Sequence, residues 1–154
     1  IRDLAAAAAE SGVRTTIYPH HGDYYLATAQ EALRVVKQVD RPNVGLTLVL
    51  LAELAADQEP DLPQIIEEIA PHLFVVAISG TDRKEKGQPV EYDRMIRPLG
   101  QGDFDVYGVL KKLEAVGFTG PVGLLCFGLK GDPAVHLRES MAAWKTYSAR
   151  LAAE

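Results

Sequence analysis

The chain has 154 residues, 47% of them hydrophobic and 24% charged, and its 21 acidic and 16 basic side chains give a formal net charge of −5 at pH 7. These values are typical of one globular domain with its own core, which excludes a small scaffold held together by disulfides or metal ions. The lack of a basic cluster argues against a nucleic-acid surface, and no apolar run is long enough to span a membrane. The single cysteine, Cys126, has no partner for an internal disulfide, which favours a cytoplasmic protein.

The first part of the chain alternates between helical and strand patterns. Alanine-rich residues up to Glu10 favour a helix that ends at a glycine. The β-branched and aromatic run 13–20 predicts a strand, and the turn after it leads into a helix over 25–39, where apolar residues recur at helical spacing. Residues 44–51 are almost all apolar, which predicts a strand buried on both faces of a parallel sheet.

The same alternation continues in the middle of the chain. A short helix is expected to begin at Leu62 and end at Pro71, and residues 73–78 form another apolar strand pattern. Apolar positions over 106–116 then describe an amphipathic helix, for which Asp103 is a plausible N-cap.

The last elements complete four strands that are each followed by a helix. Residues 121–127 predict the fourth strand, and apolar residues at helical spacing over 137–151 predict the final helix. Such an order predicts a single α/β domain over 1–154 with a parallel sheet. One architecture is a small open sheet, whose glycine-rich fingerprint is absent after the first strand. The other is half of an eight-stranded TIM barrel, because a full barrel needs about 250 residues.

Several short segments together carry a resemblance to one family. They are Ile17-Tyr-Pro-His20, Arg41-Pro-Asn-Val-Gly45, Ile78-Ser-Gly80 with Asp82, Pro98-Leu-Gly-Gln-Gly-Asp-Phe-Asp105, Gly117-Phe-Thr-Gly-Pro-Val-Gly-Leu124 and Lys130-Gly-Asp132. These segments resemble the C-terminal half of sugar phosphate isomerase/epimerase proteins, the xylose-isomerase-like TIM barrels. The resemblance implies that the strands are the fifth to eighth of a barrel whose first four lie on a preceding segment.

The resemblance also implies a reaction, aldose–ketose isomerisation or epimerisation of a small sugar or sugar phosphate. In the family a divalent ion such as Mn²⁺, Co²⁺ or Mg²⁺, held by carboxylates and imidazoles, polarises the substrate while an acid/base pair moves a proton or hydride. In this sequence the corresponding positions fall on Tyr18, Val49, Ala52, Ala77 or Ser79, and Leu125. We therefore expect no metal site and a degraded active site, altered by divergence or by design.

Polar residues at the end of the first strand are the candidate catalytic groups. His20 and His21 lie where barrel active sites are found, and Asp23 is close enough in sequence to orient an imidazole. Tyr18 is a candidate hydrogen-bond donor into the barrel. The alternative is that each histidine bonds a neighbouring loop and that the tyrosine only packs.

The loops after the third and fourth strands contain the candidate ligand-binding groups. A phosphate or another anion is the ligand expected there. The candidates are Ser79, Arg83, Gly100, Gly102, Gly128, Lys130 and Gly131. The alternatives are a solvated charged loop over 81–88 and glycines that serve only their turns. Cys126 is expected to be an inert core residue, and His136 a surface or boundary residue.

Two functions remain open from the sequence. One is an isomerase or epimerase acting on a small sugar. The other is a non-catalytic or engineered half-barrel that closes an eight-stranded barrel by homodimerisation or with a partner segment, because a half-barrel leaves two strand edges open.

Overall fold

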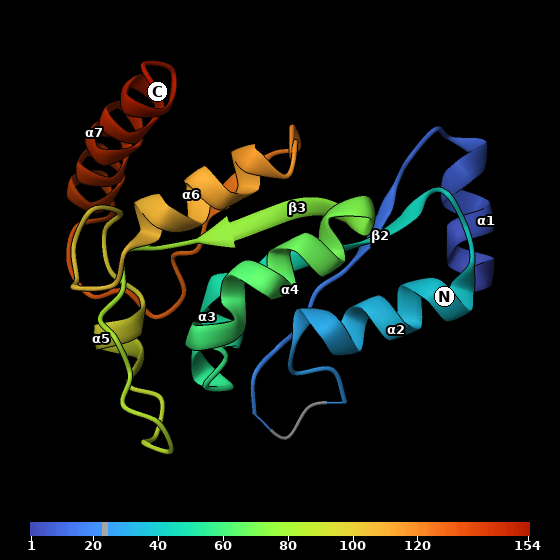
Figure 1. Ribbon diagram of the computed structural model, residues 1–154, viewed down its shortest axis with the longest axis horizontal. Coiled ribbons are helices and arrows are strands. Elements are labelled where there is room, and N and C mark those ends of the chain that lie inside the picture. The colour runs from blue at the N-terminus through green and yellow to red at the C-terminus, as the bar shows by residue number, and fades with distance from the viewer. Residues whose placement is uncertain (23–24) are drawn as a thin grey trace.

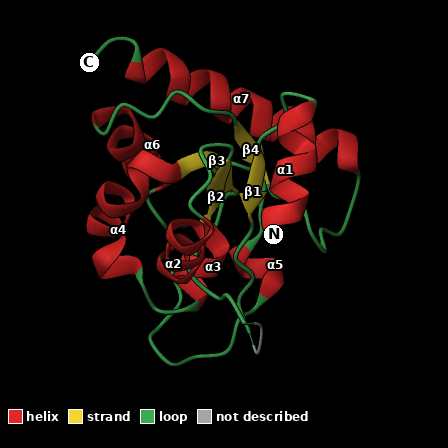
Figure 2. Cartoon of the chain, turned by 90° about the vertical axis from the view of Figure 1, so that its right-hand side faces the viewer, coloured by secondary structure: helices red, strands yellow, loops and turns green. Residues whose placement is uncertain are grey.

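A computed structural model describes residues 1–22 and 25–154 and contains one four-stranded parallel sheet. The strands are β1 (Thr15–Ile17), β2 (Val44–Val49), β3 (Leu73–Ile78) and β4 (Val122–Leu124), and they pair in chain order. Figure 2 shows the strands grouped at the centre with helices around them. The predicted parallel sheet of four strand–helix units is confirmed.

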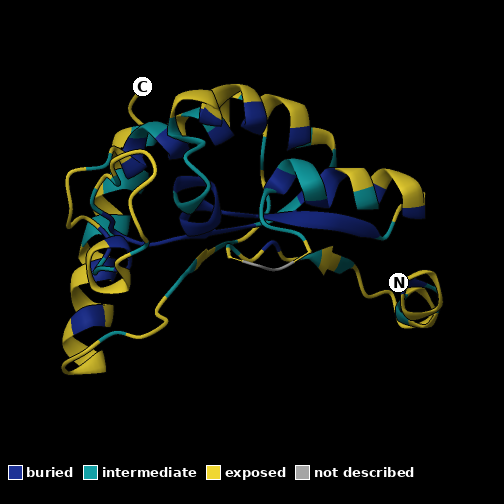
Figure 3. Ribbon diagram, turned by 90° about the horizontal axis from the view of Figure 1, so that it is seen from below, coloured by how far each residue is buried: buried dark blue, intermediate teal, exposed yellow. Residues whose placement is uncertain are grey.

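In Figure 1 the first and last helices lie at opposite sides of the molecule, and in Figure 3 one side of the buried strands is covered by helices. The helices are α1 (Arg2–Glu10), α2 (Ala29–Val39), α3 (Leu50–Ala55), α4 (Leu62–Ile69), α5 (Tyr92–Met95), α6 (Val106–Ala115) and α7 (Pro133–Leu151), with 3₁₀ turns at Glu59–Asp61 and Ala70–His72. None of the helices in the described ranges is long and apolar enough to cross a membrane.

Several predicted boundaries were wrong. The apolar run 44–51 divides at Leu50, where α3 begins, because Leu and Ala favour helix once the strand has ended. Helix α2 was expected to begin at residue 25 but begins only at Ala29, because Thr28 is its N-cap. The Thr28 hydroxyl accepts a hydrogen bond from Glu31 N, and the Glu31 carboxylate accepts one from Thr28 N. The N-cap of α6 is Asp105.

The core lies between the sheet and the helices that follow its strands. Leu46 and Leu48 of β2 and Val76 of β3 are completely buried, together with Ile66 and Ile69 on one face of α4. Each such side chain contributes roughly 2 kcal/mol by its removal from water. This packing holds the carboxyl ends of the parallel strands together at one end of the sheet.

Both edges of the sheet are open in the part of the chain that the structure describes. Strands β1 and β4 each pair with a single neighbour. Beside β4 lies an apolar cleft under α7, where Leu137 and Met141 are 55% and 52% exposed. At the other edge Leu4 of α1 is 63% exposed.

Candidate functional site

A pocket, called here the histidine pocket, lies at the carboxyl ends of the strands. The end of β2 and residues that follow β1, β2 and β4 line it together with one residue of α5. The lining residues are Tyr18, Pro19, His20, His21, Val49, Leu51, Ala52, Tyr92, Leu125 and Phe127. It therefore brings three of the four predicted catalytic residues into one place. The fourth, Asp23, lies outside the described residues.

The pocket contains a histidine–tyrosine pair. The hydroxyl of Tyr92 lies 2.9 Å from Nε2 of His21, a normal hydrogen-bond distance. The ring of His20 stacks on that of His21 with centroids 5.2 Å apart, and His20 Nδ1 is 3.0 Å from the His21 carbonyl oxygen. Phe127 packs edge-on against Tyr92 at 5.5 Å. Successive ring contacts therefore connect His20, His21, Tyr92 and Phe127 along the pocket lining.

The surroundings of these groups set their protonation. Burial, and next the charge of His20, lowers the pKa of His21 below its ordinary value, so its imidazole is neutral at neutral pH. Burial raises the pKa of Tyr18, whose hydroxyl therefore stays protonated. A neutral imidazole is a competent base, and a protonated phenol is a hydrogen-bond donor.

Sequence reasoning missed two polar residues here. Tyr92 comes 71 positions after His21, on a four-residue helix without a motif, and only the fold brings the two together. Glu53, on α3 beside the pocket residue Ala52, is completely buried. Its Oε1 accepts a hydrogen bond of 2.7 Å from Ala29 N, and Oε2 has no partner among the described residues. Burial raises the pKa of Glu53 to about 7.

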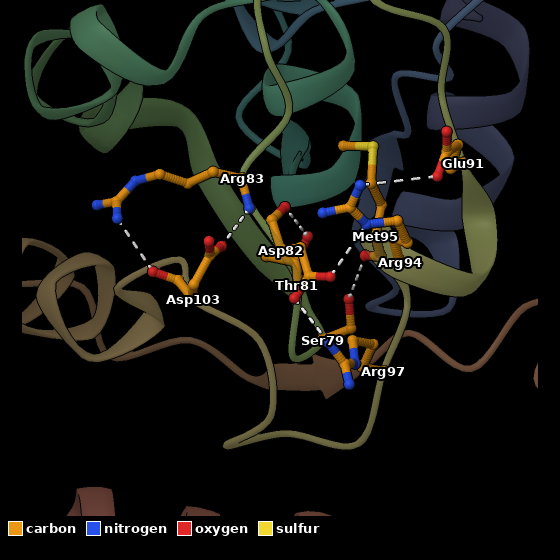
Figure 4. A network of polar contacts seen from close by, with 9 residues as sticks. All are labelled: Ser79, Thr81, Asp82, Arg83, Glu91, Arg94, Met95, Arg97 and Asp103. Atoms are coloured by element: carbon orange, nitrogen blue, oxygen red, sulfur yellow. Dashed lines mark hydrogen bonds and ion pairs between the residues drawn. The ribbon is translucent and has the colours of Figure 1, made fainter.

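A second polar cluster follows β3 (Figure 4). Arg94 Nε and Arg97 Nη1 donate to opposite oxygens of Asp82, at 3.2 and 2.7 Å. Burial works to raise the pKa of Asp82, but the hydrogen bonds from the two arginines outweigh it and lower that pKa. The buried Ser79 hydroxyl donates to the Met95 carbonyl at 3.3 Å.

Arg83 already has acidic partners in this cluster. Its Nε donates to Glu59 at 2.8 Å, while its backbone N donates to Asp103 Oδ1 at 2.6 Å. The sequence predicted Asp103 as the N-cap of α6, and this prediction was wrong. The Asp103 carboxylate instead accepts the hydrogen bond from Arg83 N, in the loop after β3. An anionic ligand at Ser79 or Arg83 must therefore compete with protein partners.

The predicted glycines divide into two groups. Gly100 and Gly102 have φ of +90° and +96°, and a Cβ on Gly102 would lie 2.0 Å from the Thr81 carbonyl oxygen, so the close approach of two loops requires glycine there. Gly128 and Gly131 have φ of +71° and +103° but open space around them. Their loop carries the exposed Lys130, which lines a small depression together with Arg97 and Gly128.

The divalent ion implied by the family resemblance does not fit the residues present. Of the positions that correspond to the family's ligands, only Tyr18 and Ser79 carry an oxygen, and the buried Ser79 hydroxyl is directed at a backbone carbonyl. Over residues 1–22 and 25–154, no group of three or more His, Cys, Asp or Glu side chains is arranged to hold a metal ion. We derive no chemical step through such an ion.

Two expectations at the end of β4 were wrong. Cys126 is exposed, because β4 ends at Leu124 and the thiol lies beyond the strand. His136 is buried, with only 8% of its surface exposed, because it faces inward from the second turn of α7. The thiol sulfur lies 3.5 Å from His136 Nε2.

Comparisons with known proteins identify the family to which the chain belongs. Residues 1–147 match the family model described as the xylose isomerase-like TIM barrel. The chain belongs to this family.

Individual relatives match with moderate identity. The chain is 30% identical over 140 residues to 3-dehydroshikimate dehydratase of Pseudomonas aeruginosa, covering 86% of this chain and 21% of that protein. It is 34% identical over 89 residues to mannonate dehydratase 1 of Halalkalibacterium halodurans, covering 58% of this chain and 24% of that protein. The structure of 3-keto-D-glucoside 4-epimerase from E. coli superimposes with a TM-score of 0.74 at 22% identity, over 94% of this chain and 50% of that one.

The chain is much shorter than these relatives. It spans less than a quarter of each curated protein and half of the solved epimerase.

Proposed function

We propose that the histidine pocket binds a small sugar or sugar phosphate and that His21 and Tyr92 move a proton on it, in an isomerisation or epimerisation. The observation that carries the proposal is the 2.9 Å contact between the Tyr92 hydroxyl and His21 Nε2. The pair lies at the carboxyl ends of the strands, where TIM-barrel enzymes place their chemistry.

The proposed reaction exchanges a proton at a carbon next to a carbonyl. The neutral imidazole of His21 accepts that proton, and a tyrosine hydroxyl donates a hydrogen bond to the carbonyl oxygen, where negative charge develops. The resulting enediolate takes the proton from His21 on the former carbonyl carbon while the neighbouring hydroxyl proton moves to the former carbonyl oxygen, which is isomerisation. In epimerisation the Tyr92 hydroxyl gives its proton to the original carbon on the opposite face, and His21 returns the proton that it holds to the Tyr92 oxygen through their contact. Among the described residues, Tyr18 and Tyr92 supply the tyrosine hydroxyls that line the pocket with His21.

The aromatic lining favours a sugar as the substrate class. Phe127 is 65% exposed and Tyr18 47% exposed, so both rings are accessible to a ligand in the pocket. The flat face of an aromatic ring suits the apolar C–H face of a sugar, and the phenol hydroxyls serve the sugar's polar edge.

Variants of the pair test this proposal. A panel of aldoses, ketoses and their phosphates is incubated with the purified protein, and interconversion is followed by NMR. We expect His21→Gln to lower the rate at least about 100-fold and Tyr92→Phe about ten-fold. His72→Gln is the matched control, because His72 follows α4 away from the pocket lining. Equal rates for the wild type and His21→Gln would show that His21 is not the base.

A second proposal follows from the open edges of the sheet. We propose that four further strand–helix units close the barrel, supplied by a longer chain or by a second copy of this one. The exposed apolar residues Leu137 and Met141 beside β4 support it, since a closed barrel covers that edge. Light scattering on the 154-residue chain distinguishes the two sources. A dimer supports closure by two copies, and a stable monomer contradicts it.

A further inference from the structure

The residues after β4 form a pocket on the other side of the chain from the histidine pocket, called here the thiol pocket. Cys126, Lys130, Gly131, Asp132, His136 and Leu137 are among its lining residues. Leu125 and Phe127, the neighbours of Cys126 in sequence, line the histidine pocket instead. Alternate residues of the stretch 125–127 line the two pockets, so the same stretch of backbone serves both.

The thiol pocket contains a nucleophile and a base in contact. Cys126 Sγ lies 3.5 Å from His136 Nε2, and the cysteine is exposed. His136 is more than nine-tenths buried, and its Nδ1 has no hydrogen-bond partner within the described chain. A purely structural buried histidine satisfies both ring nitrogens. Here one nitrogen has no partner and the other is directed at a solvent-accessible thiol.

We propose that Cys126 and His136 form a thiol-modification site that is captured by small disulfides. The His136 imidazole takes the proton of the thiol, and the thiolate attacks one sulfur of the disulfide. A new S–S bond forms to Cys126 as the original S–S bond breaks. The leaving thiolate takes the proton from His136, so one disulfide and one thiol are consumed while a mixed disulfide and a free thiol are produced.

The local environment explains why a base is needed. Burial of part of the side chain raises the pKa of the Cys126 thiol, so at rest it is protonated and unreactive. Lys130 and the backbone at the start of α7 lie around the same pocket, where the Asp132 carboxylate accepts a hydrogen bond from Ala134 N. Of the charged groups that line the pocket, Lys130 favours a thiolate and Asp132 opposes it, so the activation rests on the contact between His136 and the thiol.

The test is the rate at which the folded protein is modified by oxidised glutathione at neutral pH, followed by intact mass. Because Cys126 is the chain's one cysteine, every adduct reports on this site. We expect the folded protein to react roughly ten-fold faster than the same chain unfolded in urea, and His136→Gln to remove that advantage. His72→Gln is the matched control and is expected to react as the wild type does.

Two outcomes would overturn the proposal. A folded wild type that reacts no faster than the unfolded chain shows that the site gives no activation, and this comparison needs no variant. A folded His136→Gln variant, verified by circular dichroism, that reacts as fast as the wild type shows that the imidazole does not act on the thiol. Neither result bears on sugar interconversion, so this proposal and the proposed function fail separately.

Discussion

Replacement of the buried Glu53 by glutamine tests the electrostatics of α3, beside the histidine pocket. The glutamine keeps the oxygen that accepts from Ala29 N and removes the charge. The pKa of Glu53 is raised from 4.5 to about 7 in the folded protein. This difference corresponds to about 3 kcal/mol of unfolding free energy, because each unit between two pKa values is worth about 1.4 kcal/mol. The folded state holds the proton more tightly than the unfolded state, so the wild type loses stability as pH rises from about 4.5 to about 7.

Urea denaturation at pH 5 and pH 8 measures this effect. We expect the wild type to lose up to about 3 kcal/mol of unfolding free energy between the two pH values through Glu53, and Glu53→Gln to lose correspondingly less. Glu114→Gln, at an exposed position of α6, is the matched control and should retain the wild-type pH dependence. If Glu53→Gln and the wild type show the same pH dependence, the carboxyl is not buried in the way described.

Three further predictions concern Gly102 and Asp82, in the loops that follow β3, and His21 in the histidine pocket. Gly102→Ala should lower the free energy of unfolding in urea by about 2 kcal/mol or more. Gly87→Ala should lower it by about 1 kcal/mol, because Gly87 also has positive φ but has open space around it. Equal losses would mean that the close approach to Thr81 does not matter. Asp82→Asn should cost about 2 kcal/mol at pH 7. Because its pKa is lowered, that difference is lost as pH falls through the pKa of Asp82, and an unchanged cost well below pH 3.8 would contradict the ion-pair account. NMR titration should place the pKa of His21 below 6.5, and a value at or above 6.5 would exclude the burial described here.

The fold was largely predictable because its signals are local. The apolar runs over 44–51 and 73–78 identify buried parallel strands, and both appear in the sheet. Their exact ends were less predictable. Leu50 and Leu51 are as apolar as the strand before them, and only the geometry of the sheet determines where α3 begins.

The site was only partly predictable because its geometry depends on distant residues. His20 and His21 stand out at the end of a strand, and the structure places both in the histidine pocket. Tyr92 and Glu53 gave no signal, since an isolated tyrosine in a charged loop and a glutamate in a helical pattern both suggest solvent exposure. Cys126 and His136 were assigned the wrong environments, because hydrophobic neighbours in sequence do not show where a strand ends.

Incorporation of solvent deuterium tests the central claim most directly. The protein is incubated in D₂O with the sugar that it interconverts, and the product is examined by NMR at the carbon next to the carbonyl. Proton transfer through His21 predicts deuterium at that carbon, because the imidazole proton exchanges with solvent. A product formed without deuterium would indicate direct hydride transfer between carbons and would contradict the role assigned to the His21–Tyr92 pair.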